Sequence, residues 1–425
     1  MTGMKLLIEN GTYQLRNLGD VAMLQAAVSR LRARLPSAEL GVVTQDPKRL
    51  ARFCPGTTPI EPTGRKPASQ PKVPAATTRS WRTRLSGVAR EYLRTVVHQG
   101  RCVLLRHQGF PRAADAHPYL AALAQCDGLV VTGGGYLSDA WASHVLRLLG
   151  WIDLARRSGK SVHLVGHGLG PVTQPRLAAA LRRTLPRLDG FTLREGRFAP
   201  LWLKRWGVGA GKVQVTGDDA IETAYRARPA EGGRYLGLNI RSSAYSRVDA
   251  AMLAVLRRAL VPLAVDLQTE FLPFPIACMQ NHADLDTLSR LFAPEAVPNL
   301  PHVPADDLDP ADVIRRIGRC RAVISGSYHG GVFALAQGIP AVCLVRSRYY
   351  AQKFLGLASQ FGPECQVVRL DEPQASEQLQ IAIRRAWQCA DDWRAPLLTA
   401  AERQITLANA AYDDFFGVVS SRRAA

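Results

Sequence analysis

From residue 320 to residue 345 the chain reads CRAVISGSYHGGVFALAQGIPAVCLV. Cys320–Ser325 and Ala341–Val345 are short apolar runs, typical of strands buried in a sheet. The residues between them predict a short apolar helix, which ends at Gly338-Ile339-Pro340 because proline cannot continue an α-helix. A strand, a helix and a second strand in this order predict a βαβ unit of a parallel sheet.

The same alternation extends in both directions from this unit. Near the start of the chain, Lys5–Glu9 predicts a strand, Asp20–Leu35 a helix with arginines on its outer face, and Leu40–Thr44 a second strand. Further apolar runs predict strands at 128–132, 161–166, 190–193, 212–216, 235–240, 267–272 and 366–370, and a last helix at 398–416. The whole chain therefore has the pattern of an α/β protein.

Length and a polar break divide this series into two domains. With 425 residues, the chain exceeds the size of one ordinary hydrophobic core. The polar segment 226–234, which contains Pro229 and Gly232-Gly233, has the composition of a linker. We predict an N-terminal α/β domain at 1–228, a C-terminal α/β domain at 229–397, and a helix and tail at 398–425. Two Rossmann-like α/β domains with a cleft between them indicate a GT-B-like arrangement.

The chain is strongly basic, and part of that charge is local. Lysine and arginine outnumber acidic residues 54 to 35, a formal net charge of +19 that attracts nucleic acid, an anionic membrane or a phosphorylated substrate. Residues 63–112 hold eleven basic residues and one acidic residue, and we interpret them as a basic insertion. Residues 81–105 are amphipathic, which is typical either of a helix with one solvated face or of contact with an anionic membrane through 79–112. Aromatic residues are sparse there, so we expect no specific nucleic acid partner.

Cysteine usage and hydropathy indicate the compartment. The eight cysteines form no C-x-x-C pair, and several lie in apolar runs, which predicts reduced, buried thiols rather than disulfides or a zinc site. We see no signal peptide and no apolar run of about 18 residues, the length that a membrane-spanning helix requires. We therefore expect a cytoplasmic protein without a metal site.

Ligands of parallel sheets bind beyond the carboxyl ends of the strands, so the residues that follow each strand are the candidates for a binding site. Asn17 and Asp20 follow the first strand, and Asp20 stands at the expected start of a helix, where a carboxylate can cap free amides. Gly133-Gly134-Gly135 follows a later strand and allows backbone amides to approach an anion or a sugar. Arg194 and Arg241 follow two further strands. We predict that these residues bind substrate; a capped helix and an ordinary turn are the alternatives for Asp20 and the glycines.

The strongest candidate is the loop that follows Cys320–Ser325. It places His329 at the start of the short helix, where free amides and the helix dipole attract anions. A histidine there can exchange protons near neutral pH, which makes His329 the candidate catalytic acid; a capping or packing role is the alternative. The residues of this cluster predicted to bind substrate are Ser325, Ser327, Tyr328, Gly330 and Gly331, with Lys353 as a further cation over the cleft.

These elements, in this order, resemble the polysaccharide pyruvyl transferase family. The family's early signature is matched by Asn17-Leu18-Gly19-Asp20-Val21-Ala22, and its glycine triplet by Gly133-Gly134-Gly135. Its next elements are matched by Gly168-Leu169-Gly170-Pro171, Leu193-Arg194-Glu195 and Asp218-Asp219-Ala220. Its late motif is matched by Ser325, His329, Gly330 and Ala334, followed by Gly338-Ile339-Pro340. The matches extend from Asn17 to about Lys353, which is most of the chain.

The resemblance implies transfer of a pyruvyl group from phosphoenolpyruvate to a sugar of a cell-surface polysaccharide or its lipid-linked precursor. A ketal forms and phosphate is released, with no cofactor besides this donor substrate. His329 would be the acid and Asp20 the base; the N-terminal domain would hold the acceptor and the C-terminal domain the donor. One position departs from the family: Ser327 stands where many members carry arginine, and Arg241, Arg346, Arg348 and Lys353 are the cations that could replace it.

Two other functions stay open at the level of sequence. A GT-B glycosyltransferase that uses a nucleotide sugar would usually carry an acidic residue for the ribose, and we find none that is persuasive after Ala341–Val345. A non-enzymatic protein that binds an anionic polymer would also be basic. In the preferred case, the enzyme is cytoplasmic and could lie peripherally at the inner face of the membrane.

Overall fold

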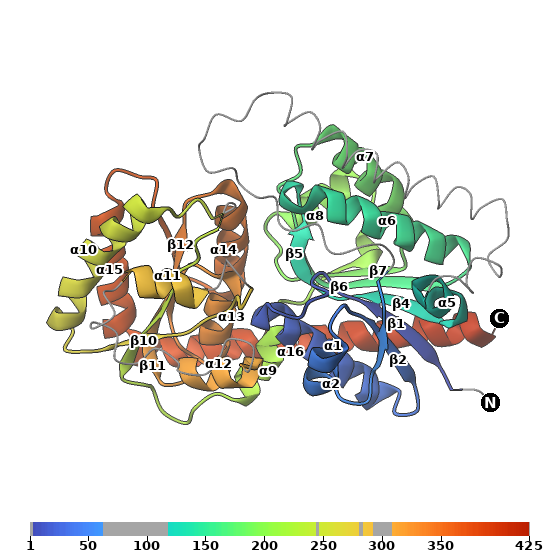
Figure 1. Ribbon diagram of the computed structural model, residues 1–425, viewed down its shortest axis with the longest axis horizontal. Helices are drawn as coiled ribbons and strands as arrows, with labels where there is room; N and C mark the ends of the chain where they lie inside the picture. Colours follow the sequence, from blue (N-terminus) through green and yellow to red (C-terminus); the bar gives the residue numbers. More distant parts are fainter. Residues whose placement is uncertain (1–2, 63–117, 244–245, 280–283, 292–307, 425) are drawn as a thin grey trace.

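The computed structural model describes residues 3–62, 118–243, 246–279, 284–291 and 308–424, which form two α/β domains (Figure 1). The predicted basic insertion 63–112, with its candidate membrane contact at 79–112, lies outside the described residues. The strands of one sheet precede the polar segment 226–234, and the strands of the other follow it.

The first sheet has eight strands in the order β3-β2-β1-β4-β6-β7-β8, with β5 paired to β6. All of these strand pairs are parallel. Its strands are β1 (Lys5–Glu9), β2 (Glu39–Val43), β3 (Thr58–Ile60), β4 (Gly128–Val131), β5 (Gly134–Leu137), β6 (Ser161–Leu169), β7 (Gly190–Leu193) and β8 (Val213–Val215). Its α-helices are α1 (Leu18–Arg34), α2 (Pro47–Phe53), α5 (Pro118–Gln125), α6 (Ala142–Arg157), α7 (Pro175–Thr184), α8 (Ala199–Arg205) and α9 (Ala220–Arg226).

The second sheet has five parallel strands in the order β10-β9-β11-β12-β13. They are β9 (Tyr235–Asn239), β10 (Phe271–Pro273), β11 (Cys320–Ser325), β12 (Ala341–Val345) and β13 (Cys365–Arg369). The helices are α10 (Ala250–Asp266), α11 (Asp284–Leu291), α12 (Pro310–Ile317), α13 (Tyr328–Ala336), α14 (Arg348–Phe361), α15 (Ala375–Gln388) and α16 (Ala390–Ala424). The predicted α/β class with two parallel sheets is confirmed.

The last helix returns to the first domain. Helix α16 begins at Ala390, eight residues before the predicted start at 398, and Figure 1 shows it extending beneath both domains. There Tyr412 donates a hydrogen bond of 3.4 Å to Asp219, which also pairs with Arg30 of α1. These contacts join α1, the start of α9 and α16. All three side chains are buried, so the ion pair and the hydrogen bond are shielded from solvent.

Backbone hydrogen bonds also join the two domains directly. The amide of Leu18 donates to the carbonyl of Ile276 at 2.9 Å, and the amide of Cys278 donates to the carbonyl of Arg16 at 2.9 Å. Asn17 and Ala277 form an antiparallel bridge between these two bonds. The segment 276–278, which follows β10, is therefore held against the loop that leads into α1.

Candidate active site

A pocket lies between the domains, at the carboxyl ends of strands from both sheets. The first domain contributes Gly11, Thr12, Asn17, Asp20, Gly135, Tyr136, Trp141 and Arg194 to its wall. The second domain contributes Arg241, Ile276, Ser327, Tyr328, His329, Tyr349, Tyr350 and Lys353. Nine of the predicted site residues therefore meet here, although they are spread over more than 300 positions of the sequence.

His329 is held in the pocket by a buried carboxylate from the other domain. It is the second residue of α13 and is 5% exposed, and its Nε2 lies 3.5 Å from Oδ2 of Asp218. Burial opposes ionisation of Asp218, but the charges of His329 and Arg194 outweigh burial and place the pKa of Asp218 below its ordinary value. The ionised carboxylate orients the imidazole and can neutralise it when the ring carries two protons.

Three cations from different elements line the same pocket. Arg194 is 2% exposed; its Nη1 lies 3.5 Å from Oδ2 of Asp218, and its guanidinium lies 4.0 Å from the centre of the Tyr328 ring. Its buried Nη2 has no hydrogen-bond partner within the described ranges. Lys353 and Arg241 complete the set. A buried guanidinium nitrogen with an unused donor, beside two further cations, favours a ligand with several negative charges.

Lys353 and Arg194 converge on the last glycine of the triplet. A Cβ atom at Gly135 would lie 2.3 Å from Nζ of Lys353 and 2.6 Å from Nη2 of Arg194, so this position has no room for a side chain. Burial and then repulsion by Arg194 hold the pKa of Lys353 well below its ordinary value. An anion between these two groups would relieve their mutual repulsion.

Asp20 enters the pocket from the first turn of α1. The N-cap of this helix is Asn17, whose side-chain oxygen accepts hydrogen bonds from the amides of Gly19 at 3.1 Å and Asp20 at 3.3 Å. The alternative in which Asp20 caps the helix is therefore excluded, and its carboxylate lines the pocket. Burial raises the pKa of Asp20, although His329 and Lys353 oppose that shift, and a raised pKa makes a carboxylate a stronger base.

Residues from several sequence motifs line this pocket, and these motifs follow one another along the chain in the order found in one protein family. The family model described as polysaccharide pyruvyl transferase matches residues 17–348. The chain belongs to this family. Five residues from the motifs of this pyruvyl transferase family line the one pocket: Asn17, Asp20, Gly135, Arg194 and His329. A search of curated proteins gives no match.

Solved structures with the same fold cover almost the whole chain. A glycotransferase of kitacinnamycin has 12% identity and a TM-score of 0.56, with 98% of this chain and 99% of that chain covered. The UDP-GlcNAc 2-epimerase from Neisseria meningitidis has 13% identity and a TM-score of 0.54, with 98% and 100% covered. The calicheamicin glycosyltransferase CalG4 has 12% identity and a TM-score of 0.51, with 98% and 99% covered. The predicted GT-B-like arrangement is confirmed, and at these identities the likeness concerns the fold alone.

Five predicted binding residues do not line the pocket. A Cβ atom at Gly133 would lie 2.3 Å from the carbonyl oxygen of Gly166, and one at Gly134 would lie 2.6 Å from the Tyr136 ring. These two glycines allow close packing behind the pocket wall, and Gly134 is the first residue of β5, whereas the sequence predicts only a turn there.

The other three shape the start of α13. The Ser325 hydroxyl donates to the carbonyl of Ser327 at 2.8 Å, and the amides of Gly330 and Gly331 donate to that carbonyl at 3.0 and 3.4 Å. The helix begins at Tyr328, one residue before His329. The predicted anion site at the amides of Gly330 and Gly331 is therefore corrected, because those amides are already used within the turn.

Several residues of the site have no role in the sequence prediction. Asp218, which lies behind the pocket wall against His329 and Arg194, belongs to one of the family motifs, and its place after β8 is a usable signal. Thr12, Tyr136 and Trp141 come from the first domain, and Tyr349 and Tyr350 from the start of α14. The hydroxyl of Tyr349 donates to the carbonyl of Gly135 at 2.8 Å across the domain boundary. Such a contact depends on how the domains pack, which a local pattern does not encode.

Two further observations concern the described part of the chain. No group of three or more His, Cys, Asp or Glu side chains in it is arranged to hold a metal ion. No helix in it is both long and apolar enough to cross a bilayer.

Proposed function

We propose that this protein transfers the pyruvyl group of phosphoenolpyruvate to a sugar of a cell-surface polysaccharide or its lipid-linked precursor, forming a ketal. The observation that carries this proposal is that Arg194, Arg241 and Lys353 line one pocket together with His329, which Asp218 contacts from behind the pocket wall. We place the reaction in the cytoplasm, where the seven described cysteines, none of which is in a disulfide, would stay reduced.

Phosphoenolpyruvate matches the charge of this pocket. Its phosphate and its carboxylate are both attached to the enol carbon, and the two groups need several cationic donors that are held apart in fixed positions. Arg194 and Lys353 converge near Gly135, and Arg241 approaches from the second sheet. Ser327 stands where many family members carry arginine, and in this proposal Arg241 supplies the positive charge of that missing arginine.

The acid and the base complete the reaction. His329 donates a proton to the methylene carbon of the donor, and a sugar hydroxyl bonds to the adjacent carbon as Asp20 takes the hydroxyl proton. The bond from that carbon to the phosphate oxygen then breaks, and phosphate leaves with the proton held by Asp20. A second hydroxyl of the same sugar closes the ketal and returns its proton to His329. No metal or cofactor enters these steps.

The direct test is phosphate release from phosphoenolpyruvate, measured with a panel of lipid-linked and nucleotide-linked sugars. We expect release with one acceptor class and a product that gains one methyl signal in its proton NMR spectrum. The opposite result is no release with any acceptor, together with a protein whose thermal unfolding shifts with a nucleotide sugar and not with phosphoenolpyruvate. That result would favour the glycosyltransferase alternative.

The pKa of Lys353 gives a prediction about pH. Lysine binds the donor anion only when protonated, and its depressed pKa means that the charge is present at low pH and lost as pH rises through that pKa. We expect the KM for phosphoenolpyruvate to rise at a pH well below 10.5, by up to about tenfold per pH unit. In Lys353→Arg this rise should disappear, because the guanidinium stays charged. Identical pH profiles for the two proteins would exclude Lys353 from donor binding.

A further inference from the structure

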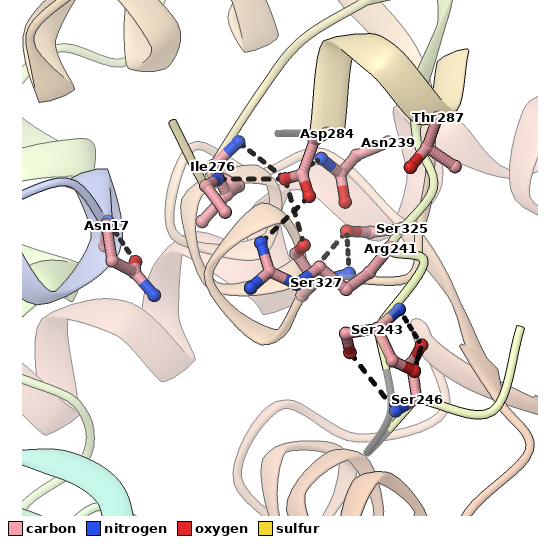
Figure 2. Close-up of polar contacts among 12 residues, drawn as sticks. Asn17, Asn239, Arg241, Ser243, Ser246, Ile276, Asp284, Thr287, Ser325 and Ser327 are labelled. Carbon is pink, nitrogen blue, oxygen red and sulfur yellow. Dashed lines mark hydrogen bonds and ion pairs between the residues drawn. The ribbon is translucent and has the colours of Figure 1, made fainter. Parts of the chain in front are cut away.

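Asp284 is a buried carboxylate that binds neighbours on all sides without lining the pocket. It is the first residue of α11 and is 1% exposed. Its Oδ1 lies 3.0 Å from Nη1 of Arg241. Its Oδ2 accepts hydrogen bonds from the side chains of Asn239 at 2.9 Å and Ser327 at 3.4 Å, and from the amides of Ile276 and Ala277, both at 2.9 Å. Figure 2 shows these donors gathered around the one carboxylate.

The donors come from the ends of three neighbouring strands. Asn239 is the last residue of β9 and Arg241 follows it, the segment 276–277 follows β10, and Ser327 follows β11. A buried charge is costly unless donors surround it, and five donors do so here. Three of the joined positions, Arg241, Ile276 and Ser327, line the pocket. One carboxylate therefore fixes the second domain's strand ends relative to the site.

The segment that Asp284 holds is also the segment that touches the first domain. The amides of Ile276 and Ala277 donate to Asp284, while the carbonyl of Ile276 accepts from Leu18. Leu18 begins α1, and Asp20 lies two residues further along that helix. A short covalent and hydrogen-bonded path thus connects Arg241, through Asp284, to the helix that carries the candidate base.

We propose that Asp284 is a positioning residue: it holds Arg241 toward the donor and fixes segment 276–278 against α1, so that donor binding and domain contact depend on one carboxylate. The role of Arg241 in donor binding rests on the proposed function. The contact with α1 does not, because it follows from backbone hydrogen bonds alone.

The test compares Asp284→Asn with a matched control, Asp249→Asn. Asp249 also stands at a helix start and pairs with an arginine, Arg346 at 2.8 Å, but neither residue lines the pocket. We expect Asp284→Asn to raise the KM for phosphoenolpyruvate about tenfold, the effect of losing one charge-assisted hydrogen bond, with a smaller change in kcat. The control should keep both constants.

A double-mutant cycle separates positioning from general stabilisation. If Asp284 acts on the donor through Arg241, the change Asp284→Asn should raise the KM by less than about twofold in an Arg241→Gln background. Equal effects of Asp284→Asn with and without Arg241 would overturn the donor part of the inference. If the Asn variant does not fold, Asp284→Glu, which keeps the charge and displaces it, takes its place in the same cycle. Failure of both variants to fold would overturn the inference, since Asp284 would then serve folding.

Amide hydrogen exchange tests the domain contact independently of activity. We expect the amides of Leu18 and Cys278 to exchange faster in Asp284→Asn and to be unchanged in Arg241→Gln and Asp249→Asn. Unchanged exchange at both amides in Asp284→Asn would overturn this part. If the wild-type protein neither binds nor consumes phosphoenolpyruvate, the proposed function fails, and the exchange result still decides whether Asp284 fixes the contact.

Discussion

Replacing His329 with alanine is expected to lower kcat for phosphate release by about 10²- to 10⁴-fold, the contribution of a well-placed general acid. The physical reason is that the methylene carbon of phosphoenolpyruvate must gain a proton before its neighbour can accept the sugar hydroxyl. His329 is the pocket residue that Asp218 holds from across the domain boundary at 3.5 Å. Because the variant keeps Arg194, Arg241 and Lys353, the KM for phosphoenolpyruvate should change much less than kcat.

The control for this variant is a second buried histidine outside the pocket. His163 lies in β6 and packs edge-on against Phe415, with ring centres 4.3 Å apart. His163→Gln should lower thermal stability and leave kcat near the wild-type value. Turnover by His329→Ala at close to the wild-type rate would remove His329 from the mechanism and leave Asp20 or the substrate phosphate as the source of the proton.

Much of the fold could be predicted from sequence where a strand is buried on both faces. Because such strands are largely continuous apolar runs, the sequence predicts four of them with their observed bounds: Lys5–Glu9, Gly190–Leu193, Cys320–Ser325 and Ala341–Val345. The strand predicted at 267–272 was wrong in position: α10 continues to Asp266, and β10 begins only at Phe271. An apolar helix that leads directly into a short strand offers no change of pattern at their boundary.

Part of the site could be predicted from the rule that ligands of parallel sheets bind beyond the carboxyl ends of the strands. That rule selected Arg194, Arg241 and the loop that carries His329, and the structure brings them to one pocket. It did not assign a role to Asp284, which lies at a helix start and acts on residues that follow other strands. It also did not distinguish glycines that face the pocket from glycines that allow packing behind it, since both kinds occupy the same turns.

Gly19 shows why this distinction matters for function. In the sequence it is the glycine of Asn17-Leu18-Gly19-Asp20, where it reads as a turn residue. In the structure it lies within the first turn of α1, against the ring of His329 from the other domain. A Cβ atom at Gly19 would lie 2.0 Å from both Cγ and Nδ1 of His329, and 2.5 Å from its Cβ. The helix needs a glycine there because the candidate acid occupies the space of a side chain.

We therefore expect Gly19→Ala to lower kcat by about 10²-fold, the typical loss when a reacting group moves by about 1 Å. The added methyl group meets the base of the imidazole, which cannot swing aside as a long side chain could, so either His329 or α1 must move.

The matched control is Gly150→Ala in α6, where a Cβ atom meets no described atom within 4 Å. The control should keep full activity and gain about 0.5–1 kcal/mol of stability from the better helix propensity of alanine. In a His329→Ala background the change Gly19→Ala should cost almost nothing further, because the ring that it displaces is gone. An equal loss in both backgrounds would show that Gly19 affects activity by a route other than His329.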